Sequence, residues 1–211
     1  MKRREFALCA AAAALPGLLA LPAQAQSDKG YVELRQRVAA ESPAGQIEVI
    51  EFFSYGCPHC RDFEPIFEAW KKSVPKDVTV RRVHVSFQSS FEPLQRIYYS
   101  LEALGKTDDP VHGKVFDALL TEHKRLDKPE VLFSWIAEQG LNRAKFEEVY
   151  KSFGVATKVR RALQLQEAYG VEGTPALGIA GRFYTDASMA AGFERMIKLT
   201  NELIAQVRKG G

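Results

Sequence analysis

The sequence predicts an α/β fold with an all-helical insertion after its second strand. Three observations support this prediction: a strand, a helix and a strand follow one another over residues 47–87, helical patterns alone occupy 91–154, and two short strands and a long helix come after them. We expect a single core rather than two independent domains, because 211 residues with 46% hydrophobic content can bury one core with a sizeable insertion.

The N-terminus has the three parts of a cleaved export signal. Residues 2–4 are basic, an uncharged apolar run covers 6–21, and the Ala-Gln-Ala at 23–25 is a small-x-small cleavage site. We therefore predict a signal peptide over 1–25 and a mature chain that begins near Gln26. The two arginines near the start also fit twin-arginine export, although the Sec route is favoured. The alternative is an uncleaved membrane anchor, but proline and glycine interrupt the apolar run.

Loss of residues 1–25 changes the charge and the cysteine count. Removing three of the 29 basic and one of the 26 acidic residues leaves 26 and 25, a net charge of +1. This balance excludes the basic surface of a nucleic-acid-binding protein. Cys9 leaves with the signal, so only Cys57 and Cys60 remain. A bridge across so short a loop constrains the unfolded chain little, which indicates a chemical rather than a structural pair.

The cysteine pair lies where a strand passes into a helix. The run IEVIEFFS at 47–54 is typical of a strand buried on both faces, and the alternating run at 78–87 predicts the next strand. Between them, RDFEPIFEAWKKSV places its large apolar residues at helical spacing, so Cys57 would stand in the first turn of a helix. Pro65 lies inside this helix and is expected to kink it.

The rest of the chain is predicted from caps and periodicity. Pro129 opens one helix and Gly140 closes it, while Asn142 caps a second helix that we expect to run to Gly154. The elements expected after it are a helix at 155–169, a strand at 176–180 that turns at Gly181 into a second strand, and a final helix at 188–208.

This order, with C-x-x-C at the first strand-to-helix junction, resembles the thioredoxin fold. The segment EFFSYGCPHC, the helical insertion and the GTPA that precedes the third strand resemble the periplasmic thiol:disulfide oxidase family, DsbA. The resemblance covers essentially the whole mature chain. It implies a first thioredoxin-fold part at 26–90, the insertion at 91–154 and a second part at 155–211.

The resemblance and the chemistry of thiols assign roles to the CPHC tetrad. The Cys57 thiolate is the expected nucleophile, because a helix N-terminus favours an anion and the His59 side chain can add a donor or a positive charge. Pro58 forms the turn and Cys60 is the resolving partner. A stabilised thiolate favours the reduced form and makes the disulfide a strong oxidant, as the resemblance implies.

Two other uses of a C-x-x-C pair are a zinc site and the attachment of a c-type haem. A zinc site needs two further ligands, and His84, His112 and His123 are scattered without a second metal-binding motif. Attachment of a c-type haem needs His after the second cysteine, where this chain has Arg61. We therefore predict neither a metal nor a cofactor.

Thr174 and Pro175 form the second predicted part of the site. The sequence alone would make them an ordinary turn, because few X-Pro bonds are cis. The resemblance implies a cis proline that packs against the cysteines, preceded by a residue whose backbone binds an extended substrate peptide. The family often has Val before this proline, so Thr174 is expected to alter substrate release or the redox potential.

Glu51 is unusual because it is a carboxylate inside a predicted buried strand. The family resemblance implies a buried acid that helps proton transfer at the second cysteine; the alternative is an exposed strand edge. Arg82 falls near the position of the family's lysine partner and should hold Glu51 ionised. His84, Trp70 and Trp135 are expected to be core or face residues.

Three functions are open at this point. The first is a periplasmic, monomeric oxidase that donates the Cys57–Cys60 disulfide to newly exported proteins and is reoxidised by a quinone-linked membrane partner of the DsbB kind. The second is a disulfide isomerase or reductase, which usually has an N-terminal dimerisation domain that residues 26–46 are too few to make. The third is a redox-inactive chaperone, which the retained CPHC tetrad disfavours.

Overall fold

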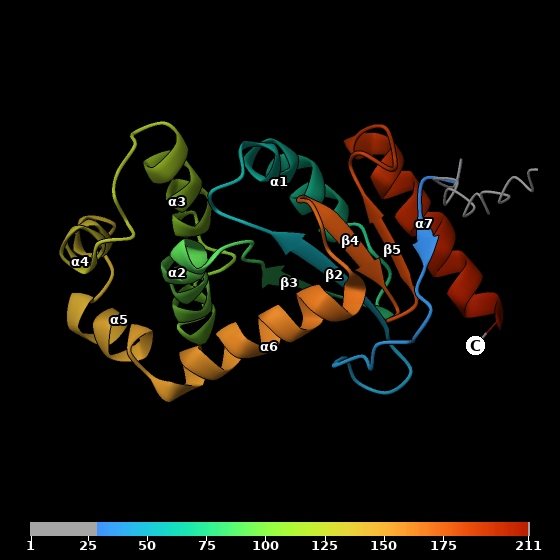
Figure 1. The fold of residues 1–211 in the computed structure, drawn as a ribbon, viewed down its shortest axis with the longest axis horizontal. Coiled ribbons are helices and arrows are strands. Elements are labelled where there is room, and N and C mark those ends of the chain that lie inside the picture. Colours follow the sequence, from blue (N-terminus) through green and yellow to red (C-terminus); the bar gives the residue numbers. More distant parts are fainter. Residues whose placement is uncertain (1–28, 211) are drawn as a thin grey trace, which may run out of the picture.

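The computed structural model describes residues 29–210 as a five-stranded sheet with helices on both faces (Figure 1). The elements in chain order are β1 (Val32–Glu33), β2 (Ile47–Phe53), α1 (Pro58–Lys71), β3 (Val78–His84), a 3₁₀ turn (Ser89–Phe91), α2 (Glu92–Ala103), α3 (Val111–Leu120), α4 (Pro129–Glu138), α5 (Arg143–Tyr150), α6 (Phe153–Tyr169), β4 (Ala176–Ile179), β5 (Phe183–Asp186) and α7 (Phe193–Gly210). The strand order is β1-β5-β4-β2-β3, in which β2 and β3 are parallel and the other neighbours antiparallel.

This topology confirms the predicted thioredoxin fold with a helical insertion. Helices α2 to α5 follow β3 and gather at one end of the molecule, away from β4 and β5 (Figure 1). The two-residue strand β1, which pairs with β5, was not predicted, because its sequence is too short to carry a strand pattern.

Strand β2 lies at the centre of the core and is buried along its whole length. Val49 belongs to an apolar cluster with residues of α1 and α7, whereas Ile50 and Phe52 belong to a second cluster with α6 and the insertion. Burial on both faces explains the nearly continuous apolar run of this strand. A charged side chain on β2 therefore needs a partner inside the protein.

The junction between α5 and α6 differs from the prediction. Helix α5 ends at Tyr150, and Ser152 caps α6 by accepting a hydrogen bond from the N–H of Val155. Gly154 thus lies inside α6 instead of ending α5, and Phe153 at the start of α6 is 79% exposed. The boundary expected between residues 154 and 155 is wrong, because the serine cap outweighs the glycine as a signal.

Two further element boundaries differ from prediction, whereas one helix cap and three buried residues agree with it. Strand β3 ends at His84, and Phe87, expected on it, is 47% exposed; α7 begins at Phe193 and not at residue 188. Asn142 caps α5 as predicted, and the buried residues include His84, Trp70 and Trp135. The predicted signal peptide at 1–25 lies outside the described residues. Across 29–210, every helix is too short or too polar to cross a membrane.

Candidate active site

Cys57 occupies the N-cap of α1. Its backbone is extended (φ −102°, ψ 113°), and the fixed φ of Pro58 suits the first helical position that follows. The Cys57 carbonyl accepts the N–H of Cys60 at 3.1 Å, and its own N–H donates to the Ser54 carbonyl at 3.0 Å. Both cysteines are free thiols; Cys57 is partly exposed and Cys60 is buried. The structure thus places Cys57 within reach of a substrate and Cys60 behind it.

The two thiols ionise very differently. Hydrogen bonding from the Cys60 side chain is the main cause that lowers the pKa of Cys57 to about 5; burial opposes it, and the Thr174 side chain and the backbone N–H groups of Cys60 and His59 add to it. Burial raises the pKa of Cys60, and the neighbouring Cys57 raises it further. At neutral pH the site therefore holds a thiolate on Cys57 and a proton on Cys60.

The backbone N–H of His59 helps to lower the pKa of Cys57, and the donor role expected of its side chain stays a prediction. The imidazole is exposed and lies on the wall of a groove of about 330 Å³. The other lining residues are Gly173, Thr174, Pro175, Asp186, Ala187, Ser188 and Phe193.

Thr174 and Pro175 meet the cysteine pair at the end of the sheet where β2 ends and β4 begins. The peptide bond between them is cis, and the Cys57 Sγ lies 3.4 Å from the Thr174 carbonyl oxygen. The groove therefore passes beside the nucleophile. A groove with backbone groups at its edge suits an extended peptide.

Glu51 and Arg82 are neighbours in the register of the parallel pair β2 and β3. The Arg82 Nε donates to Glu51 Oε2 at 2.7 Å, and the two side chains are 5% and 1% exposed. The exposed-edge alternative for Glu51 is therefore wrong. The sequence predicts that Arg82 holds Glu51 ionised, and the structure differs. Burial outweighs the guanidinium and raises the pKa of Glu51 to about 7.

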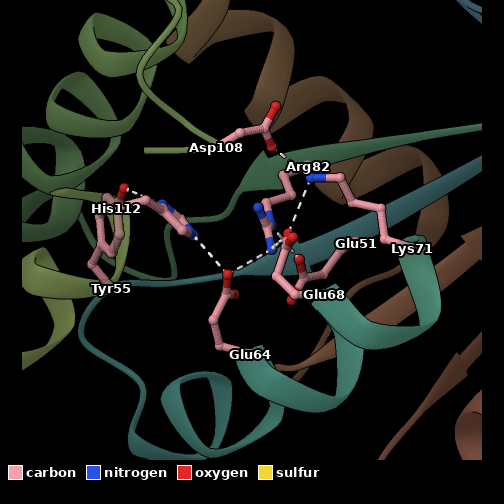
Figure 2. A network of polar contacts seen from close by, with 8 residues as sticks. All are labelled: Glu51, Tyr55, Glu64, Glu68, Lys71, Arg82, Asp108 and His112. Carbon is pink, nitrogen blue, oxygen red and sulfur yellow. Dashed lines mark hydrogen bonds and ion pairs between the residues drawn. The ribbon is translucent and has the colours of Figure 1, made fainter. Parts of the chain in front are cut away.

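Two further carboxylates share the same guanidinium. The Arg82 Nη2 donates to Glu64 and to Glu68, each at 2.8 Å (Figure 2). We call Glu51, Glu64, Glu68 and Arg82 the Arg82 cluster. Both α1 residues escaped prediction from the sequence, although their i, i+4 spacing places them on one face of the helix. Three carboxylates around one guanidinium leave the cluster with excess negative charge when all are ionised.

Within the described part of the chain, His, Cys, Asp and Glu side chains do not gather in a group of three or more that could hold a metal ion.

Comparisons with known proteins agree with this geometry. A family model described as DSBA-like thioredoxin domain matches residues 48–203. The thiol:disulfide interchange protein DsbA of Bordetella parapertussis is 43% identical over 203 residues, which cover 96% of each chain. The protein of the same name from Pseudomonas aeruginosa is 36% identical over 198 residues, 92% of this chain and 93% of that one.

Solved structures give the same result. The crystal structure of Pseudomonas aeruginosa DsbA matches with a TM-score of 0.83 and 36% identity, covering 86% of this chain and 94% of that chain. The oxidoreductase NmDsbA1 from N. meningitidis matches with a TM-score of 0.76 and 28% identity, covering 86% and 93%. One solved neighbour is titled as a threonine-to-valine mutant of DsbA1 in its oxidised form.

Proposed function

The chain belongs to the DSBA-like thioredoxin family and is a thiol:disulfide oxidoreductase, and on this premise we propose that it acts as an oxidase. It donates the Cys57–Cys60 disulfide to newly exported proteins. The observation that carries this proposal is the unequal ionisation of the two thiols, with the pKa of Cys57 at about 5 and that of Cys60 raised. A reduced form that is stabilised as a thiolate makes its disulfide more oxidising.

The exchange takes two steps. A substrate thiolate attacks the exposed Cys57 sulfur, the Cys57–Cys60 bond breaks, and a mixed disulfide forms while Cys60 leaves as a thiolate. Cys60 then takes a proton, since burial raises its pKa. A second substrate thiolate attacks the first substrate sulfur and releases Cys57 as a thiolate. Two electrons pass from the substrate to the protein; of the two substrate protons, Cys60 keeps one and solvent receives the other.

Glu51 is the proposed proton donor for Cys60. A buried carboxyl with a pKa of about 7 is partly protonated at neutral pH, which suits an acid that gives up a proton and later regains it. The Glu51→Gln variant should lose the pH dependence of exchange near pH 7. An unchanged dependence would remove Glu51 from the mechanism.

The proposal extends to the substrates of the protein, its cellular compartment and the partner that reoxidises it. Unfolded exported proteins with cysteines bind as extended segments in the groove beside Thr174 and Pro175. The protein acts in the periplasm as a monomer, and a DsbB-like membrane partner linked to quinone reoxidises it. The supporting observations are the sequence pattern at 1–25, outside the described residues, and the similarity to DsbA proteins.

The deciding experiment is the equilibrium of the Cys57/Cys60 couple with glutathione, read by thiol trapping of the mature protein. A strongly oxidising couple with an acidic Cys57 thiol supports the oxidase. A reducing, thioredoxin-like couple would place the protein among the reductases or isomerases.

A further inference from the structure

His112, on α3 of the helical insertion, lies between two residues that flank the cysteine pair in the sequence. Its Nδ1 is 2.6 Å from the hydroxyl of Tyr55, two residues before Cys57. Its Nε2 faces Glu64, four residues after Cys60, across 3.4 Å (Figure 2). His112 and Tyr55 are 3% and 0% exposed. The buried imidazole of His112 thus brings the insertion into contact with Glu64 of the Arg82 cluster.

The contacts define which nitrogen carries the proton. Burial opposes ionisation of Glu64, but His112 and Arg82 outweigh it and hold the pKa of Glu64 below its usual range. An ionised carboxylate only accepts hydrogen bonds, so the His112 Nε2 carries the hydrogen and Nδ1 accepts from the Tyr55 hydroxyl. Within residues 29–210, the His112 Nε2 makes no well-formed hydrogen bond, and the Glu64 Oε1 at 3.4 Å is the carboxylate oxygen that it faces.

Glu64 presents one oxygen to both neighbours. Its Oε1 is 2.8 Å from the Arg82 Nη2 and 3.4 Å from the His112 Nε2, and the Arg82 Nε contacts Glu51 at 2.7 Å. The interaction therefore runs from His112 through Glu64 and Arg82 to Glu51. A donor that satisfies Glu64 leaves more of the guanidinium for Glu51.

His84 is a second buried histidine, but its hydrogen-bond partners are of a different kind from those of His112. The Nε2 of His84 accepts the Tyr55 N–H at 3.0 Å, and its Nδ1 is 2.9 Å from the Val85 carbonyl, so backbone groups hold both nitrogens. His112 has side-chain partners instead. The polar groups that surround it are Tyr55, Glu64, Glu68, Arg82, His84, Tyr98 and Asp108.

We propose that His112 is a positioning residue of the redox site, which satisfies Glu64 so that Arg82 remains available to Glu51 behind the cysteine pair. This inference rests on the proposed role of Glu51 in proton transfer. It gives the helical insertion a part in the chemistry, in addition to any part in binding substrates.

The two amide analogues of histidine separate its two contacts. The amide nitrogen of Gln reaches about as far as Nε2, and the amide of Asn about as far as Nδ1. His112→Gln therefore keeps a donor toward Glu64, His112→Asn keeps a partner for Tyr55, and His112→Leu keeps neither. Tyr55→Phe is the matched control, because it removes only the contact between the phenol and the imidazole.

The measurement is the titration of Glu51 in the reduced protein, followed by NMR of ¹³C-labelled glutamate carboxyl groups and assigned with Glu51→Gln. In His112→Asn and His112→Leu, Glu64 draws on Arg82 more strongly, so the Glu51 midpoint should rise by roughly half a unit to one unit. It should stay near the wild-type value in His112→Gln and Tyr55→Phe. If His112→Leu does not fold, the Asn and Gln variants decide.

An unshifted midpoint in His112→Asn would overturn the inference, as would an equal shift in His112→Gln or in Tyr55→Phe. The readout does not depend on catalysis. If Glu51→Gln left the pH dependence of exchange unchanged while His112→Asn moved the Glu51 midpoint, the proton-transfer role would fail and the positioning role of His112 would stand.

Discussion

The pKa shifts at the start of α1 are opposite in effect to those in the Arg82 cluster, which lies against the same helix. At the helix start, Cys57 is partly exposed, several donors converge on its sulfur, and its pKa falls to about 5. In the cluster, Glu51 is 1% exposed and contacts a guanidinium that also serves Glu64 and Glu68, and burial raises its pKa to about 7.

The difference lies in the number of donors available to each charge. The thiolate has the Cys60 and Thr174 side chains and two backbone N–H groups, whereas the three carboxylates share one arginine and Lys71 adds a donor to Glu68. A nearby positive charge is therefore insufficient to keep a buried carboxylate ionised when other anions compete for it. The helix start favours an anion and the cluster retains a proton, which are the two things that thiol exchange requires.

Arg82→Met should have the largest effect, because it leaves three carboxylates without the guanidinium between them. Removing one partner from a buried ion pair costs about 3–5 kcal/mol of stability. Urea unfolding of the mature protein measures this loss. Arg208→Met is the matched control, since Arg208 pairs with Asp77 at an exposed site and its loss should change stability little. Similar losses of stability in both variants would show that burial of the Arg82 cluster does not increase its contribution to stability.

Glu51→Gln tests the raised pKa through stability. Folded Glu51 holds its proton up to about pH 7, whereas the unfolded carboxyl loses it near 4.5. The folded state therefore binds more protons across this window, and wild-type stability falls relative to Glu51→Gln as the pH rises. The slope is at most about 1.4 kcal/mol per pH unit. Parallel stability curves for the two proteins between pH 4.5 and 7 would contradict the raised pKa.

The sequence predicted the parts of the fold and site that depend on local pattern. The apolar run of β2 identifies a strand buried on both faces, and a carboxylate within that run, Glu51, requires a partner. Arg82 follows from this requirement together with the family resemblance. The motif places Cys57 at a helix start because the apolar spacing of α1 begins directly after it.

The parts that escaped prediction depend on how distant elements pack. Glu64 and Glu68 have the pattern of a solvated helix face, and only the side chain that β3 presents to α1 shows that they are partners of Arg82. His112 was one of several scattered histidines until the insertion placed α3 against α1. The α5–α6 boundary failed for a local reason, because Ser152 and Gly154 give competing signals and the cap prevailed.

Among single changes at the start of α1, Cys60→Ala should destabilise the Cys57 thiolate most. The Cys60 side chain provides the largest contribution to the lowered pKa of Cys57. Without this donor, we expect the pKa of Cys57 to rise by roughly one to two units. The ultraviolet absorbance of the thiolate, followed against pH in the reduced protein, measures this change. An unchanged midpoint would mean that the helix backbone alone supports the anion.

Thr174→Val should give the smallest shift, because it removes one donor of several. The Thr174 side chain lowers the pKa of Cys57, so its loss should raise that pKa by roughly one unit or less. The potential of the couple should become less oxidising by about 30 mV or less, since 1.4 kcal/mol corresponds to about 30 mV for two electrons. Thiol trapping against glutathione measures the potential, and the Cys57 titration serves as the paired readout. A shifted potential with an unshifted thiolate would mean that Thr174 acts through the disulfide form, and an unchanged potential would remove it from the groups that tune the couple.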